Sequence, residues 1–292
     1  MFQCYDFVQV IKSVGVNFLQ AGHSHKKIVI LTGNEIRHEF FRKSLSNNPL
    51  IDVITTYCEG DEKSLQNRTD QNKNSSQLER LHVSARTQTE KDFFSSFIEN
   101  AGDQSNPRFI SKGDINSSSV VEEIVNSHAD LIVCYGSSLI KSELLEIYKG
   151  RFLNVHLGLS PYYRGSGTNV WPLINGEPDM VGATFMYIDS GIDTGEIIHQ
   201  IRADIYLGDS PHSIGNRLIR KMTDVYAELV VEFEQLIPVE QPVDRGVLYF
   251  QKDFDQAACR RLYDNFSAGM IERYINSPPP LRYIAQNPGI AQ

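Results

Sequence analysis

The chain has 292 residues, of which 41% are hydrophobic and 22% charged, a composition typical of a folded globular protein rather than a disordered or fibrous one. The 28 Lys and Arg residues against 36 Asp and Glu give a formal net charge of −8, which argues against a broad nucleic-acid-binding surface. Four scattered cysteines without a CxxC pair indicate neither a zinc knuckle nor a secretory disulfide framework, and they favour a reducing, cytoplasmic setting. No apolar run approaches the roughly 18 residues of a membrane helix.

Along the chain, short β-branched stretches alternate with helical patterns. The first 25 residues lack the features of a signal peptide and predict a helix packed on the main domain or on a neighbouring subunit. Strands are predicted at 27–33, 51–56, 109–110, 130–136, 152–156, 181–188 and 197–205, and helices at 35–45 with Asn34 as cap, 78–98, 120–125 and 211–236. The polar run 66–77 predicts a loop. This alternation predicts an α/β fold with a doubly wound, mostly parallel sheet.

The sequence predicts that the two ends of the chain are additions to this core. Pro238 and Pro242 mark a linker, followed by a strand at 247–250 and a helix at 255–266. The last segment is too short to bury a core of its own. We therefore predict an N-terminal helical extension (1–26), a catalytic domain (27–236) and a small C-terminal extension (237–292), whose apolar residues are compatible with a homodimer.

Three polar segments, at 135–138, 154–167 and 189–195, follow predicted strands, where doubly wound sheets bind ligands. Asn154 and His156 are two residues apart on a strand, so they share a face, and an amide beside an imidazole can stabilise a developing oxyanion. Asp193, in a turn between two glycines, could lie beside His156 and favour its cationic form. Taken singly, each of these residues fits a structural role in a strand end or a turn better than a catalytic one.

Other candidate sites are weaker. Arg164 and Gly165 could clasp an anion, but the loop lacks the Lys-Ser/Thr of a P-loop, and the pattern favours a plain surface loop. Gly33 stands alone after the first strand, so the glycine fingerprint of a nicotinamide-binding fold is missing. The remaining histidines have no metal-ligand spacing, and no metal is predicted.

Residues 151–198 together resemble the folate-dependent formyltransferase family, which includes glycinamide ribonucleotide, methionyl-tRNA and amino-sugar N-formyltransferases. The hallmarks are Asn-x-His, a Leu-x-Pro…Arg-Gly loop, Gly-x-Thr and Asp-x-Gly. In this chain they fall at Asn154/His156, Leu159/Pro161, Arg164/Gly165, Gly182/Thr184 and Asp193/Gly195. The resemblance covers roughly 27–236 and implies a Rossmann-like formyltransferase core.

The resemblance implies transfer of the formyl group of N10-formyltetrahydrofolate to an amine by direct attack, without a metal. By this resemblance, Asn154 and His156 stabilise the oxyanion that forms on the formyl oxygen. Asp193 keeps His156 protonated and helps to move the proton of the amine. Arg164 and Gly165 would contact the acceptor. Folate would be held mainly by main-chain groups of Ser137, Ser138, Leu139, Ile140, Asp189, Ser190, Gly191 and Ile192.

The acceptor stays open among several classes. Leu157-Gly158 stand where many members have Pro-Ser, which weakens any hydroxyl contact to the acceptor there. The loop around Thr184 resembles the tRNA enzymes, but the short C-terminal segment and acidic charge argue against tRNA. We therefore favour a small-molecule acceptor, a nucleotide-linked amino sugar, over glycinamide ribonucleotide, methionyl-tRNA or hydrolysis of formyl-folate. A folate sensor or a nicotinamide oxidoreductase would share the fold.

Overall fold

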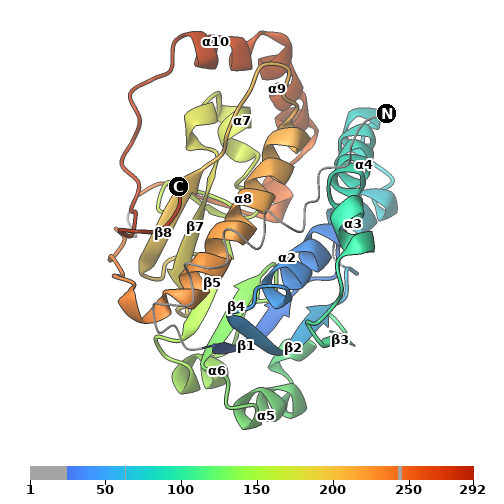
Figure 1. The fold of residues 1–292 in the computed structure, drawn as a ribbon. Helices are drawn as coiled ribbons and strands as arrows, with labels where there is room; N and C mark the ends of the chain where they lie inside the picture. The colour runs from blue at the N-terminus through green and yellow to red at the C-terminus, as the bar shows by residue number, and fades with distance from the viewer. Residues whose placement is uncertain (1–24, 63, 243–244) are drawn as a thin grey trace, which may run out of the picture.

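A computed structural model describes residues 25–292 apart from residue 63 and residues 243–244, and within them a seven-stranded sheet is flanked by helices (Figure 1). The strand order is β3-β2-β1-β4-β5-β7-β8. The strands of this sheet are β1 (Lys26–Thr32), β2 (Ile51–Glu59), β3 (Pro107–Ile110), β4 (Leu131–Tyr135), β5 (Phe152–His156), β7 (Gly182–Tyr187) and β8 (Ile197–Arg202).

The sheet is mostly parallel and doubly wound, as the sequence predicts. Strands β1 to β5 are parallel to one another, whereas β7 runs antiparallel to β5 and β8 antiparallel to β7. The chain builds outward from β1 in both directions, so the order reverses between β1 and β4. The carboxyl ends of the strands around this reversal are where such folds bind ligands.

Helices cover both faces of the sheet because its central strands are buried on both sides. The helices are α2 (Ile36–Ser46), α3 (Leu65–Gln71), α4 (Gln77–Asn100), α5 (Ser118–Asn126), α6 (Ser142–Ile147), α7 (Trp171–Asn175), α8 (Pro211–Val231), α9 (Gln256–Ser267) and α10 (Met270–Asn276). In β1, Ile28 and Ile30 pack into the larger apolar cluster with α2, α4 and α8, whereas Val29 and Leu31 face the smaller cluster with α5 and α6.

The prediction of a loop at 66–77 is wrong, because most of this run is helical. The hydroxyl of Ser64 accepts the N–H of Asn67 at 3.2 Å and starts α3, and a reciprocal capping box between Ser76 and Glu79 starts α4. Only Thr69 of α3 is buried, so this helix has almost no apolar periodicity to reveal it.

The predicted cap of the first helix is also displaced by one residue. Glu35, not Asn34, is the N-cap of α2, and the backbone N–H of Glu35 is donated to Nδ1 of His38 at 3.1 Å. Burial and the nearby Arg37 lower the pKa of His38 well below its ordinary value, which suits this acceptor role.

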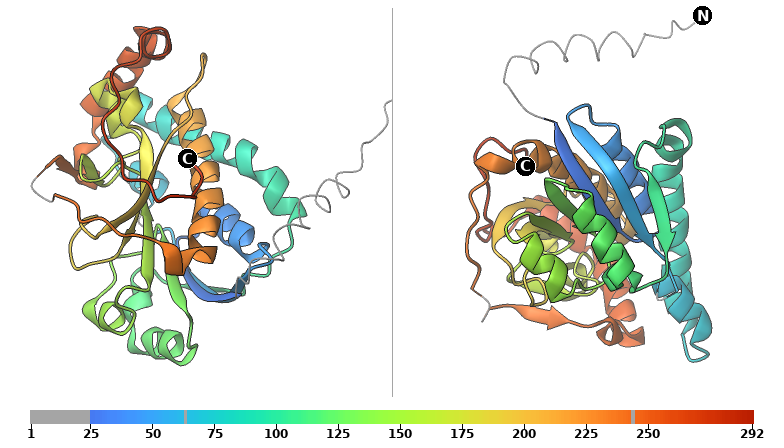
Figure 2. Two further views of the ribbon diagram at one scale, coloured as in Figure 1. Left: turned by 60° about the vertical axis from the view of Figure 1, so that its left-hand side comes forward. Right: turned by 90° about the horizontal axis from the view of Figure 1, so that it is seen from below.

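The C-terminal segment packs tightly on the core. Strand β9 (Val247–Tyr249) pairs in parallel with the short β6 (Tyr163–Gly165), and Leu262, Met270 and Ile271 are buried in the larger apolar cluster. The final coil runs along β8 (Figure 2). There the N–H of Asn287 is donated to the side chain of His199 at 3.0 Å. The strand and helix predicted at 247–250 and 255–266 are thus present as β9 and α9.

The helix predicted for 1–26 falls almost entirely on residues outside those described here. Within the described part of the chain, no helix is both long enough and apolar enough to cross a membrane.

Candidate active site

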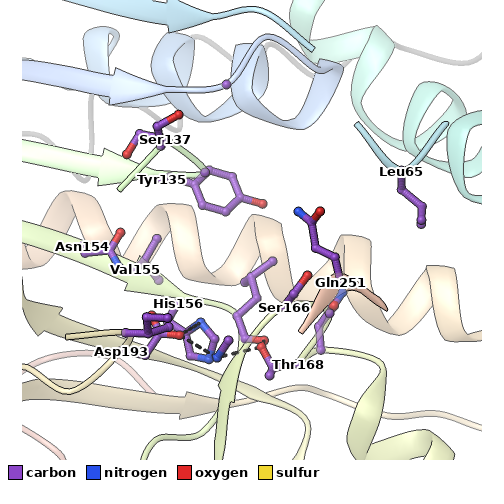
Figure 3. Close-up of a pocket in the computed structure, with 18 of the residues that line it drawn as sticks. Leu65, Tyr135, Ser137, Asn154, Val155, His156, Ser166, Thr168, Asp193 and Gln251 are labelled. Atoms are coloured by element: carbon purple, nitrogen blue, oxygen red, sulfur yellow. Dashed lines mark hydrogen bonds and ion pairs between the residues drawn. The ribbon is translucent and has the colours of Figure 1, made fainter. Parts of the chain in front are cut away.

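A cavity of about 900 Å³ opens at the carboxyl end of the sheet, where β1, β4 and β5 end (Figure 3). Its walls come from the loops after these strands, from the 189–195 loop and from the β9 region of the C-terminal segment. The volume lies within the range of small-molecule sites, about 300–1,000 Å³. The cavity therefore lies where the strand order and the polar segments of the sequence predict a site.

Strand β5 places Asn154 and His156 side by side in the wall of this cavity, as their spacing predicts. Asn154 is half-buried, and among the described residues its side-chain amide has no hydrogen-bond partner. His156 is only 8% exposed. The amide of Asn154 is thus available to a ligand, whereas the imidazole is held by the protein.

The imidazole of His156 faces hydrogen-bond acceptors through both nitrogens. Nε2 lies 2.9 Å from the carbonyl oxygen of Tyr163 and 3.1 Å from the hydroxyl of Thr168. That hydroxyl donates its own proton to the carbonyl of Leu157, so Nε2 is the donor in both contacts. Nδ1 faces Oδ2 of Asp193 at 3.3 Å (Figure 3). Both nitrogens of the ring therefore have partners within the protein.

Asp193 is fixed by an unusual backbone conformation and by its loop. Its φ is +53°, in the left-handed region that Asp tolerates better than most residues. Within the same loop, the carboxylate of Asp189 accepts the N–H of Gly191 at 2.9 Å and the hydroxyl of Thr194 at 2.8 Å. The turn predicted between the glycines therefore presents Asp193 to His156.

Gly165 contributes through its backbone. Its N–H is donated to Oδ2 of Asp193 at 2.7 Å, so one oxygen serves both Gly165 and His156. Gly165 has a φ of +91°, and a Cβ there would lie 2.1 Å from the carbonyl oxygen of Tyr249. Only glycine fits between β9 and this carboxylate. Its predicted partner in an anion clasp, Arg164, is half-buried and does not line the cavity.

Gln241 of the C-terminal segment stabilises the loop that carries Asp193. Its side-chain nitrogen donates to the carbonyl oxygens of Asp193 at 3.0 Å and of Gly195 at 2.6 Å. Gln241 is 9% exposed, and its own Oε1 has no hydrogen-bond partner. A buried oxygen without a hydrogen-bond partner lowers the stability of the fold. The contribution of Gln241 to the site therefore comes from its two N–H groups.

We expect Gln241→Ala to lower turnover about 10-fold and to lower the thermal midpoint as well, because the carbonyl oxygens of Asp193 and Gly195 lose their hydrogen-bond donor. Gln241→Glu should be worse, since it places a carboxylate against two carbonyl oxygens. Steady-state kinetics across pH measure both, with the exposed Gln235→Ala as control. Wild-type turnover and an unchanged pH profile in Gln241→Ala would remove Gln241 from the positioning of Asp193.

The residues predicted to hold folate all line the cavity, in the loops 137–140 and 189–192. Part of the main chain in the first loop is already engaged, however. The N–H of Ser138 is donated to the buried carboxylate of Glu59 at 2.6 Å, and the carbonyl of Leu139 accepts the side-chain N–H of Asn116 at 3.0 Å. These two groups shape the loop, which leaves other main-chain groups of the two loops to face a ligand.

Sequence reasoning missed three residues that organise the site: Thr168, Gln241 and Glu59. Glu59 ends β2 and, besides Ser138, accepts from Lys112 at 3.0 Å and from the N–H of Gly113 at 2.8 Å. None of the three belongs to a local pattern, because each acts on residues distant in the chain. In the described part of the chain, no three His, Cys, Asp or Glu side chains form a group able to hold a metal ion.

At the other end of the cavity, His82 of α4 and His212 of α8 pack ring to ring, with centroids 4.7 Å apart. Burial, reinforced by His212 and Arg86, lowers the pKa of His82 to about 3. Burial and Arg86 likewise lower the pKa of His212 to about 4. Both rings are therefore neutral at physiological pH.

We expect the free energy of unfolding to decrease as the pH falls from 6.5 towards 4, because the unfolded chain binds protons at these histidines before the folded chain does. His212→Gln should remove about 2 kcal/mol of the difference in unfolding free energy between pH 7.5 and pH 5. Urea titrations at the two pH values measure it, with the exposed His25→Gln as control. An undiminished difference in His212→Gln would mean that His212 is not the proton-linked group.

The formyl transferase family matches residues 26–230. Methionyl-tRNA formyltransferases from Thermodesulfovibrio yellowstonii and Alkaliphilus oremlandii are 40% and 34% identical over 108 and 131 residues. These matches span 37% and 44% of this chain but only 33% and 42% of the relatives.

Two solved structures share the fold. A sugar N-formyltransferase from a Shewanella species is 20% identical with a TM-score of 0.50, and the match covers 78% of each chain. A phosphoribosylglycinamide formyltransferase from Anaplasma phagocytophilum is 13% identical with a TM-score of 0.51, covering 78% of this chain and 100% of that one. Because the family match extends over most of the chain, including the whole of the sheet, this protein belongs to the formyl transferase family.

Proposed function

We propose that the protein transfers the formyl group of N10-formyltetrahydrofolate to a primary amine of a nucleotide-linked amino sugar. The observation that carries this proposal is the arrangement of Asn154, His156 and Asp193. An unengaged amide lies beside an imidazole that is paired with a carboxylate, all in one wall of a cavity of about 900 Å³. Membership of the formyl transferase family supports the reaction class.

In this mechanism Asn154 is the direct hydrogen-bond donor to the formyl oxygen. The lone pair of the acceptor amine attacks the formyl carbon, and negative charge builds on the oxygen as the carbonyl π bond opens. The side-chain N–H of Asn154 is free to meet that oxygen. A donor placed in this way lowers the barrier by about 3–4 kcal/mol, or about 100-fold to 1,000-fold in rate.

His156 stabilises the developing negative charge, and Asp193 transfers the proton. The cationic ring of His156, held by Tyr163, Thr168 and Asp193, supplies positive charge close to the developing oxyanion. Asp193 takes the proton that the attacking nitrogen loses, directly or through one water. The bond from the formyl carbon to N10 of the folate then breaks, and N10 takes up a proton as the formyl group remains on the acceptor.

The folate and the acceptor would approach Asn154, His156 and Asp193 from different sides of the cavity. The loops 137–140 and 189–192 border the cavity near Asn154, and we assign the folate to them. The wall formed by the C-terminal segment presents aromatic side chains beside Gln251: Phe250 is 48% exposed, and Tyr249 is stacked on Trp171, behind the cavity lining, with centroids 4.3 Å apart. Such a wall suits the flat base of a nucleotide-linked acceptor.

Methionyl-tRNA is the second candidate acceptor, because the sequence relatives carry that name. A formyl-transfer assay with N10-formyltetrahydrofolate tests the proposal, using a panel of nucleotide-linked 3- and 4-amino sugars, glycinamide ribonucleotide and charged initiator tRNA. Turnover with an amino sugar alone is the expected result. Turnover with charged initiator tRNA alone would overturn the amino-sugar acceptor and make methionyl-tRNA the acceptor. Absence of folate binding would refute formyl transfer from folate.

A further inference from the structure

Three guanidinium groups and two carboxylates gather at the end of the cavity bordered by α3 and α4. Arg37 binds the carboxylate of Glu90 through contacts of 3.0 and 3.2 Å and also pairs with Glu35. Arg86 donates to Glu90 at 2.9 Å. Although burial alone would raise it, Arg37 and Arg86 lower the pKa of Glu35 to about 2, so this carboxylate stays ionised. All of these residues line the cavity.

Arg68 of α3 is the third guanidinium and differs from the others in its partners. Among the described residues, no carboxylate lies within ion-pair distance of Arg68, and its buried Nε has no hydrogen-bond partner. Burial and the charge of Arg86 lower its pKa. Of the three guanidinium groups, Arg37 and Arg86 are thus paired with Glu35 and Glu90, whereas Arg68 has no carboxylate at ion-pair distance in the described part of the chain.

We infer that Arg68, supported by Arg86, is an anion-binding subsite that receives a phosphate group of the acceptor. Arg68 and Arg86 both line this cavity, and a guanidinium without a carboxylate partner is stabilised by an anion that accepts from it. A guanidinium suits a phosphate because it offers parallel donors. The neutral rings of His82 and His212 border the same space without adding charge. This inference rests on the proposed function, since it names which part of the acceptor is recognised.

The position of the subsite favours the acceptor over the folate. Figure 3 shows Leu65, also of α3, on the opposite side of the cavity from Ser137 and Asn154, which border the proposed folate loops. The tail of a folate also carries carboxylates, and these anions could bind the same guanidinium as a phosphate. The two sources are separated by asking which substrate loses affinity when the charge of Arg68 is removed.

The test measures pyrophosphate binding and substrate KM values in Arg68→Met, which keeps the apolar stem, and in Arg68→Lys, which keeps the charge. We expect pyrophosphate to raise the thermal midpoint of the wild type and of Arg68→Lys but not of Arg68→Met. In Arg68→Met, the KM for a phosphorylated acceptor should rise about 10-fold to 100-fold, with the KM for the formyl donor unchanged. Arg80→Met, on α4 but outside the cavity lining, is the matched control.

The outcomes separate this inference from the proposed function. Equal pyrophosphate stabilisation of Arg68→Met and wild type would overturn the subsite even if formyl transfer to an amino sugar is observed. Loss of pyrophosphate binding in Arg68→Met alone would support the subsite even if no amine on the panel is formylated. A rise confined to the KM for the formyl donor would overturn the assignment to the acceptor and give the anion to the folate tail.

Discussion

His156→Ala is expected to lower formyl transfer by at least about 100-fold, with folate binding largely retained. The substitution removes the ring that pairs with Asp193 and that supplies positive charge at the developing oxyanion. It also leaves the buried carbonyl of Tyr163 without its donor, at a cost of about 1–3 kcal/mol in unfolding free energy. Turnover and urea titrations measured together separate the two effects.

A second variant isolates the charge of His156 from its structural bond. His156→Gln retains an N–H donor for the carbonyl of Tyr163 but cannot become cationic, so it should be nearly as stable as the wild type and almost as inactive as His156→Ala. His199→Gln is the matched control, because His199 is also buried, is hydrogen-bonded to Ala291 and Asn287, and does not line the cavity. Near-normal turnover in His156→Gln would contradict a role for the cationic ring.

Asp193→Asn is expected to lower turnover about 100-fold and to flatten its pH profile. Asparagine is the informative replacement because it tolerates the left-handed φ of +53° that this position requires, so the loop keeps its shape. Its oxygen can still accept the N–H of Gly165. What disappears is the negative charge facing Nδ1 of His156 and the site that takes the amine proton.

The pH profile distinguishes proton handling by Asp193 from simple positioning. Steady-state rates of the wild type and Asp193→Asn across pH give the comparison, and the thermal midpoints should agree. Asp130→Asn is the control, since Asp130 accepts the N–H of Lys27 away from this cavity. If Asp193→Asn keeps the pH dependence of the wild type at any reduced rate, Asp193 takes no part in moving protons.

Much of the fold follows from the sequence alone because the central strands are short, apolar and regularly spaced. The stretch from Ile28 to Leu31 alternates between two buried faces, and a strand of this kind requires helices on both sides. The spacing of Asn154 and His156 places both on one face of β5, which the structure confirms. The order of the motifs from residue 151 to residue 198 is enough to indicate the family.

Local patterns were insufficient where the cause of a structure is polar or distant. Helix α3 begins at a serine cap and buries only Thr69, so its sequence has the composition of a loop. The pairing of β6 with β9 joins residues 163–165 to 247–249, and the sequence predicts β9 but neither the three-residue β6 nor the pairing itself. Short elements such as these are stabilised by their partners rather than by their own propensities.

The sequence determined which residues carry the candidate chemistry, and the tertiary structure decided how they are held. The hydrogen bond from Gln241 to the carbonyl of Asp193 spans 48 positions along the chain, and that between Thr168 and His156 spans 12. Arg68 is distinguished only by the absence of a carboxylate near it in the described structure. Periodicity records the burial of single elements, whereas hydrogen bonds and charge balance depend on atoms that only the folded chain brings together.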